Sequence, residues 1–102
     1  MNYKEVNTKK EYNLLILKVK KETEKLFYKY PEITIYKIIL DQLIDIISSL
    51  KSNKKFTDNE IYKRYNLGAI AVKNFDCDED LYGRELQDIF GGLFDYHQMP
   101  DK

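Results

Sequence analysis

Hydrophobic residues recur at intervals of three and four along most of this sequence, which is the period of an amphipathic helix. The first apolar stripe lies between Thr8 and Pro31, and lysines and glutamates fill most of the positions between its members. Thr8 and Glu11 have the spacing of a capping box, and Pro31 disfavours helical geometry at the residue before it. The pattern predicts a helix of about five or six turns that ends at Pro31. Its apolar members are Tyr12, Leu15, Ile16, Val19, Leu26, Phe27 and Tyr30.

A second apolar stripe extends from about Glu32 to Leu50 and is wider than the first. The β-branched residues within Ile33–Tyr36 would also suit a strand, but the longer period favours a helix. Because this stripe is wide, we expect the helix to lie centrally, with neighbours on more than one side. A polar connector follows at residues 51–55.

A second capping box, within Thr57–Glu60, predicts the start of a third helix. Ile61, Tyr62 and Tyr65 are expected to face the core on this helix. The segment Asn66–Gly68 then predicts a stop or a kink, because glycine tolerates the left-handed geometry of a helix C-terminus.

Beyond this point, apolar residues between Ala69 and Phe75 predict either a short further helix or a continuation of the third. Asp78 or Asp80 can cap a last helix. The pair Gly91-Gly92 predicts either a break in that helix or a close approach by a neighbour, since each glycine costs about 1 kcal/mol relative to alanine. The stripe of the last helix consists of Tyr82, Leu86, Ile89, Phe90 and Leu93.

Together these stripes predict one domain over residues 1–102 with an all-α fold, a compact antiparallel bundle of four to five helices. The sequence has neither a basic-then-apolar leader nor a long apolar run, so we expect a cytoplasmic protein without a membrane contact. A single cysteine excludes an internal disulfide and a cysteine-based zinc site.

The charges cancel overall but are unevenly distributed along the chain. Residues 1–30 carry a net charge of +4 and residues 31–74 a net charge of +2, whereas residues 75–102 carry −6. An acidic C-terminal third predicts either a surface that attracts a basic partner or a fold in which these acids contact the lysines of the same chain.

The sequence contains only incomplete patterns for a catalytic or metal site. Residues Asp76–Asp80 resemble the start of a calcium loop, but Leu81 and Gln87 occupy the positions that need glycine and glutamate. Cys77 and His97 lie at opposite ends of the last helix, too far apart for nucleophile and base, and His97 is interpreted as a surface residue. We therefore expect no enzyme activity, no cofactor and no metal. The carboxylates of Glu85 and Asp88 share one helical face and are interpreted as a solvated edge.

The first helix offers an alternative function. Tyr28 or Tyr30 could stack on bases, and the lysines of this helix could contact phosphates: Lys18, Lys20, Lys21, Lys25 and Lys29. This pattern would suit a small nucleic-acid-binding or regulatory protein.

The C-terminal third resembles the tail of small bacterial immunity proteins. The residues that carry the resemblance lie in three segments: Asn74–Asp76, Leu81–Leu86 and Ile89–Tyr96. Such proteins accompany polymorphic toxins of the contact-dependent growth inhibition and bacteriocin type. The tyrosine-tyrosine-proline motif of immunity proteins against DNase colicins is not reproduced by Tyr96–Pro100.

This resemblance implies an inhibitor that binds a cognate toxin domain in a 1:1 complex, with a nuclease acting on tRNA or DNA as the expected toxin. It implies no direct contact of this chain with nucleic acid. The expected toxin-binding surface is acidic, with carboxylates that attract a basic toxin and tyrosines that anchor it. The carboxylates are Asp76, Asp78, Glu79, Asp80, Glu85 and Asp88, and the tyrosines are Tyr82 and Tyr96.

Overall fold

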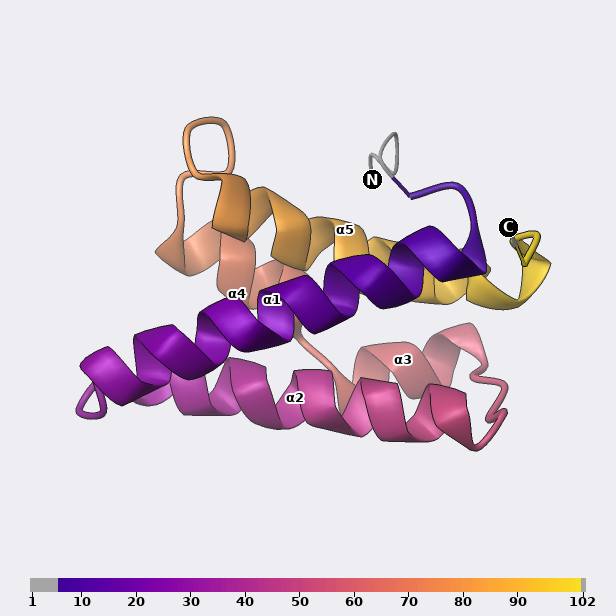
Figure 1. Ribbon diagram of the computed structural model, residues 1–102, viewed down its shortest axis with the longest axis horizontal. Coiled ribbons are helices and arrows are strands. Elements are labelled where there is room, and N and C mark those ends of the chain that lie inside the picture. The colour runs from indigo at the N-terminus through magenta and orange to yellow at the C-terminus, as the bar shows by residue number, and fades with distance from the viewer. Residues whose placement is uncertain (1–5, 102) are drawn as a thin grey trace.

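Helices account for all the regular structure of the residues that the computed structural model describes, 6–101. There are five α-helices and a short 3₁₀ helix among these residues (Figure 1): α1 Lys9–Lys29, α2 Thr34–Lys51, α3 Asp58–Arg64, α4 Leu67–Asn74, α5 Leu81–Asp95 and η1 Tyr96–Gln98. The predicted all-α bundle is therefore confirmed. Within the same residues, no helix combines the length and the apolar character that crossing a membrane would require.

Helix α1 lies in the middle of the bundle and runs antiparallel to both α2 and α5 (Figure 1). The expectation that the second helix lies centrally is wrong, because α2 packs mainly on α1 and leaves Ile38 and Ile44 exposed. The short helices α3 and α4 pack against α5. A wide apolar stripe thus does not by itself give a helix several neighbours.

The local signals at the helix ends act largely as expected. Thr8 accepts a hydrogen bond from the Glu11 backbone at 3.1 Å, and α1 ends at Lys29, just before Pro31. At the start of α3, Thr57 and Glu60 form both reciprocal hydrogen bonds of a capping box. These caps satisfy backbone N–H groups that a helix start otherwise leaves unpaired.

The break between α3 and α4 lies earlier than predicted. Helix α3 ends at Arg64, the extended Tyr65 follows, and Gly68 lies inside α4 with ordinary helical backbone. The interpretation of Gly68 as a left-handed helix end is therefore wrong. Gly68 instead permits close packing, because a Cβ atom there would lie 3.0 Å from Cδ2 of Phe90 on α5.

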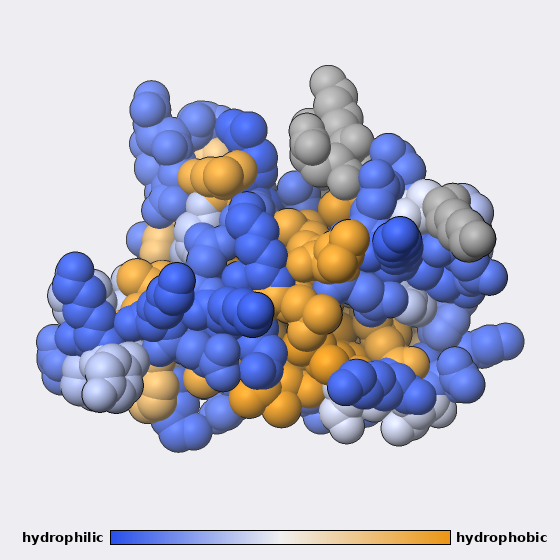
Figure 2. Space-filling model, in the orientation of Figure 1, coloured by the Kyte–Doolittle hydropathy of each residue, from blue (hydrophilic) through white to orange (hydrophobic). Residues whose placement is uncertain are grey.

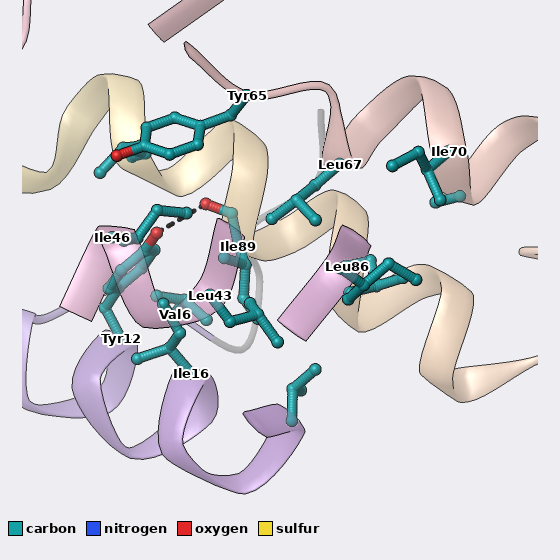
Figure 3. Close-up of a cluster of buried hydrophobic side chains, with 14 of the residues drawn as sticks. Val6, Tyr12, Ile16, Leu43, Ile46, Tyr65, Leu67, Ile70, Leu86 and Ile89 are labelled. Atoms are coloured by element: carbon teal, nitrogen blue, oxygen red, sulfur yellow. Dashed lines mark hydrogen bonds between the residues drawn. The ribbon is translucent and has the colours of Figure 1, made fainter. Parts of the chain in front are cut away.

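The bundle encloses one apolar core, part of which is drawn in Figure 3. The three long helices supply most of it, and α3 and α4 close one side. Fully buried members include Tyr12 and Ile16 from α1, Leu43 and Ile46 from α2, Leu67 from α4, and Leu86 and Ile89 from α5.

One apolar area remains uncovered on the face shown in Figure 2. Leu14 and Leu17 of α1 and Ile44 of α2 are roughly half exposed, and Ile47 lies beside them. We call these four residues the aliphatic patch. Lys18, Lys21 and Lys51 are among the lysines that line its edges.

The crossing of α1 over α5 is a close contact of the core. The Tyr12 ring is fully buried, and its hydroxyl donates a 2.7 Å hydrogen bond to the carbonyl of Ile89. A Cβ atom at Gly92 would lie 2.9 Å from Cε1 of Tyr12, so the close approach predicted for the glycine pair occurs there and α5 continues through it. Burial raises the pKa of Tyr12 well above its ordinary value.

We expect Tyr12→Phe to lower the free energy of unfolding by about 1 kcal/mol, because it removes one buried hydrogen bond without changing the ring. Tyr28→Phe is the matched control: this side chain is 90% exposed, and its free energy of unfolding should change by less than about 0.5 kcal/mol. Urea denaturation measures both. Equal effects of the two substitutions would contradict the role given to the Tyr12 hydroxyl.

Candidate functional site

The loop between α4 and α5 carries four carboxylates, none of which is fully buried. Asp76, Asp78 and Glu79 are exposed and Asp80 is half-buried. None of the four forms an ion pair with any residue between 6 and 101. We call these four residues the acidic loop.

Hydrogen bonds within the acidic loop fix its backbone. The N–H groups of Glu79 and Asp80 both donate to the Asp76 carbonyl, at 3.0 and 2.6 Å. The Asp78 N–H donates to Oδ1 of Asp76 at 3.1 Å, and Oδ1 of Asp80 accepts from the Tyr82 N–H at 2.9 Å. Asp80 is thus the N-cap of α5, one of the two caps predicted, and the loop's negative charge lies at the positive end of the helix dipole.

The loop also determines the chemistry of the single cysteine. Burial raises the pKa of the Cys77 thiol, and the charges of Asp76, Asp78 and Asp80 raise it further. A thiol with a raised pKa is a poor nucleophile, because the thiolate is the reactive form. His97 lies at the far end of α5, where a ring nitrogen is 2.9 Å from the carbonyl of Lys54. The histidine is half-buried and docked there, so its interpretation as a surface residue is wrong.

Glu85 and Asp88 do not form the solvated edge that we expected. Both side chains are buried, at 6% and 7% exposed, because their face of α5 turns toward the bundle. Oε2 of Glu85 lies 2.6 Å from Nζ of Lys18 on α1. The hydrogen bond to Glu85 raises the pKa of Lys18, which favours its charged form.

The two candidate anchor tyrosines lie in the core of the free protein. Tyr82 shares a 2.6 Å hydrogen bond with the hydroxyl of Thr23 on α1, and burial raises its pKa to about 12. The Tyr96 hydroxyl accepts from Asn13 at 3.0 Å, and its ring packs edge-on against Tyr12. They are 7% and 9% exposed, which leaves only an edge of each ring for a partner.

An exposed aromatic surface lies elsewhere, between α3, α4 and α5. Tyr62 was expected to face the core, but it is 68% exposed, and its ring packs against Phe90 and Phe94 at centroid distances of 6.1 and 5.0 Å. With α4 it forms a groove of about 680 Å³, which we call the aromatic groove. Its lining consists of Tyr62, Tyr65, Asn66, Gly68, Ala69, Val72, Lys73, Gln87 and Phe90.

The structure thus separates the eight candidate residues into two groups. Four remain accessible in the acidic loop, and the other four, Tyr82, Glu85, Asp88 and Tyr96, are buried along α5 and η1. Between residues 6 and 101, histidine, cysteine and carboxylate side chains nowhere gather into a group of three that could hold a metal ion.

Comparison with known proteins gives a match to a family model. The family model named Tsi6, which describes type VI secretion immunity proteins, matches residues 12–96. The matched range extends from α1 to the start of η1 and includes both the acidic loop and the aromatic groove. No curated protein and no solved structure gives a significant match.

The ion pair between Lys18 and Glu85 provides a test of the buried carboxylate. We expect Lys18→Met to lower the free energy of unfolding by about 1–3 kcal/mol, because it leaves Glu85 charged, buried and without its cation. Lys20→Met removes an exposed ion pair with Glu24 on the same helix, and the change should stay below about 0.5 kcal/mol.

Adding Glu85→Gln to Lys18→Met should recover part of the loss, since the double variant no longer buries an unpaired charge. Urea denaturation of the three variants measures these differences. A loss for Lys18→Met no larger than that for Lys20→Met would show that the pair is not a constraint on the fold.

Proposed function

The chain belongs to the Tsi6 family of type VI secretion immunity proteins, and from this premise we propose that it neutralises its toxin through the acidic loop. The proposal is a direct 1:1 complex between this chain and a toxin domain, in which the chain acts as an inhibitor and not as an enzyme. Asp76, Asp78, Glu79 and Asp80 meet basic side chains on the toxin.

One observation carries this proposal: the acidic loop holds four carboxylates in a fixed backbone, and no cation between residues 6 and 101 pairs with them. The net charge of residues 75–102 is −6, so the loop lies in the negative part of the chain. A preformed cluster of one sign accelerates association with a surface of the opposite sign and disfavours wrong partners. Its fixed backbone also lowers the ordering entropy that binding would otherwise require.

The buried candidates have a smaller part in this proposal. Glu85 and Asp88 are too deeply buried to touch a toxin in the free conformation, and the charge of Glu85 is offset by Lys18. Contact by Tyr82 and Tyr96 stays a prediction that is limited to the exposed edges of their rings. The acidic loop is therefore the part of the predicted surface on which the proposal depends.

A nuclease remains the toxin class that we propose, because an enzyme that binds tRNA or DNA needs a basic surface around its substrate. The alternative function, nucleic-acid binding by α1, has less support. Lys18 and Lys20 are engaged by Glu85 and Glu24, which leaves fewer cations for phosphate than the sequence suggested.

A charge reversal in the acidic loop tests the proposal. We expect Asp78→Lys combined with Glu79→Lys to slow association with the cognate toxin domain by about tenfold or more, and to abolish protection of toxin-expressing cells. Asp80 is left unchanged because its carboxylate caps α5.

The matched control is Asp41→Lys combined with Asp101→Lys, which changes the net charge equally. Each of these acids is exposed and pairs with one partly or fully exposed lysine, so little stability should be lost. Surface plasmon resonance gives the association rates, and survival of toxin-expressing cells gives protection. If the Asp78/Glu79 variant associates and protects like the control, the proposed surface is wrong.

A further inference from the structure

Two features make the aromatic groove suitable for a protein side chain. Its walls are aromatic and apolar, and two of its residues, Tyr62 and Val72, are 68% and 67% exposed although most large apolar side chains are covered. It is also concave, because Gly68 has no side chain and the ring of Phe90 lies directly against α4 at that point. Tyrosine offers a large contact area and a hydroxyl at low entropic cost, and tyrosines frequently dominate binding energy in protein complexes.

The groove also lies next to the acidic loop. Val72 and Lys73, at the C-terminal end of α4, form one end of its lining. The chain leaves α4 at Asn74, and the loop's first carboxylate, Asp76, follows almost at once. On the other side, Gln87 and Phe90 belong to α5, whose N-cap is Asp80. Two of the three helices that bound the groove, α4 and α5, are therefore the helices that the acidic loop connects.

We propose that the aromatic groove is the second half of the toxin-binding surface and that it receives an apolar or aromatic side chain of the toxin. This inference rests on the proposed function. The charge pattern determines the occupant. An apolar floor beside four carboxylates that form no ion pair among residues 6–101 fits an apolar side chain flanked by lysine or arginine. The acidic loop attracts and orients the toxin, and Tyr62 and Phe90 provide the desolvated contact that slows its release.

This division of roles gives the two halves different kinetic signatures. Charges outside the desolvated centre of an interface act mainly on association, whereas buried aromatic anchors act mainly on dissociation. We expect Tyr62→Ala to weaken binding of the cognate toxin domain by about thirtyfold or more, almost entirely through faster dissociation. Tyr62→Phe keeps the ring and should retain most of the affinity.

The control is Tyr28→Ala, which removes the same side chain from an exposed position on α1. Circular dichroism and thermal melting should be unchanged for both alanine variants, because each side chain is mostly exposed. Surface plasmon resonance with the purified toxin domain gives the rates, and analytical ultracentrifugation of this chain alone gives its association state.

The outcomes separate this inference from the proposed function. If Tyr62→Ala binds within about threefold of Tyr28→Ala while the Asp78/Glu79 variant associates slowly, the groove inference is overturned and the acidic-loop proposal stands. If Tyr62→Ala dissociates faster while the Asp78/Glu79 variant behaves like the wild type, the groove is the toxin site and the acidic-loop proposal is overturned. If Tyr62→Ala instead dissolves a dimer of this chain and leaves toxin binding intact, the groove belongs to a second copy and the inference is wrong.

Discussion

The antiparallel contact between α1 and α5 is the constraint on which the rest of this structure depends. Tyr12 packs against Gly92, Lys18 pairs with Glu85, and Thr23 bonds to Tyr82. Residues later in α1 therefore contact residues earlier in α5. The absence of a side chain at Gly92 brings the helices close enough for the Tyr12 hydroxyl to reach the Ile89 carbonyl. A shift of either helix along the other would break all of these contacts together.

That contact also decides which acids remain available for function. Because α1 lies along α5, polar groups on the inner face of α5 bond to residues of α1. Glu85 forms an ion pair with Lys18, and the Tyr82 hydroxyl shares a hydrogen bond with Thr23. The acidic loop precedes α5, and its carboxylates form no ion pair among residues 6–101. The contact of acids with lysines of the same chain, one of the two alternatives that the charge distribution allowed, thus occurs at Glu85 and not in the acidic loop. Attraction of a basic partner by the loop stays a prediction.

The sequence predicted the helices well because the helix period and the end signals are local properties. The capping box at Thr57, the stop at Pro31 and the close approach at Gly92 each follow from residue type and spacing. What it could not predict is which face of a helix meets a neighbour. Tyr62 carries both an apolar ring and a polar hydroxyl, so it suits either the core or the surface. Helix α3 is too short for its apolar pattern to distinguish these two positions.

The same limit explains the candidate site. Spacing alone places Glu85 and Asp88 on one face of α5, but only the position of α1 shows that this face is buried. The sequence does indicate that the acidic loop lies at the surface, because consecutive charged residues beside a helix start seldom enter a core. Its part in toxin binding stays a prediction. The aromatic groove is formed by residues from three helices, and no single stretch of sequence contains its pattern.

Hydrogen exchange of this chain, alone and in complex with its toxin domain, tests the location of the binding surface most directly. The account predicts slower exchange in peptides that cover residues 75–82 and 60–73, with no change over the aliphatic patch on α1 and α2. Slower exchange confined to the aliphatic patch, with the loop and the groove unchanged, would contradict it.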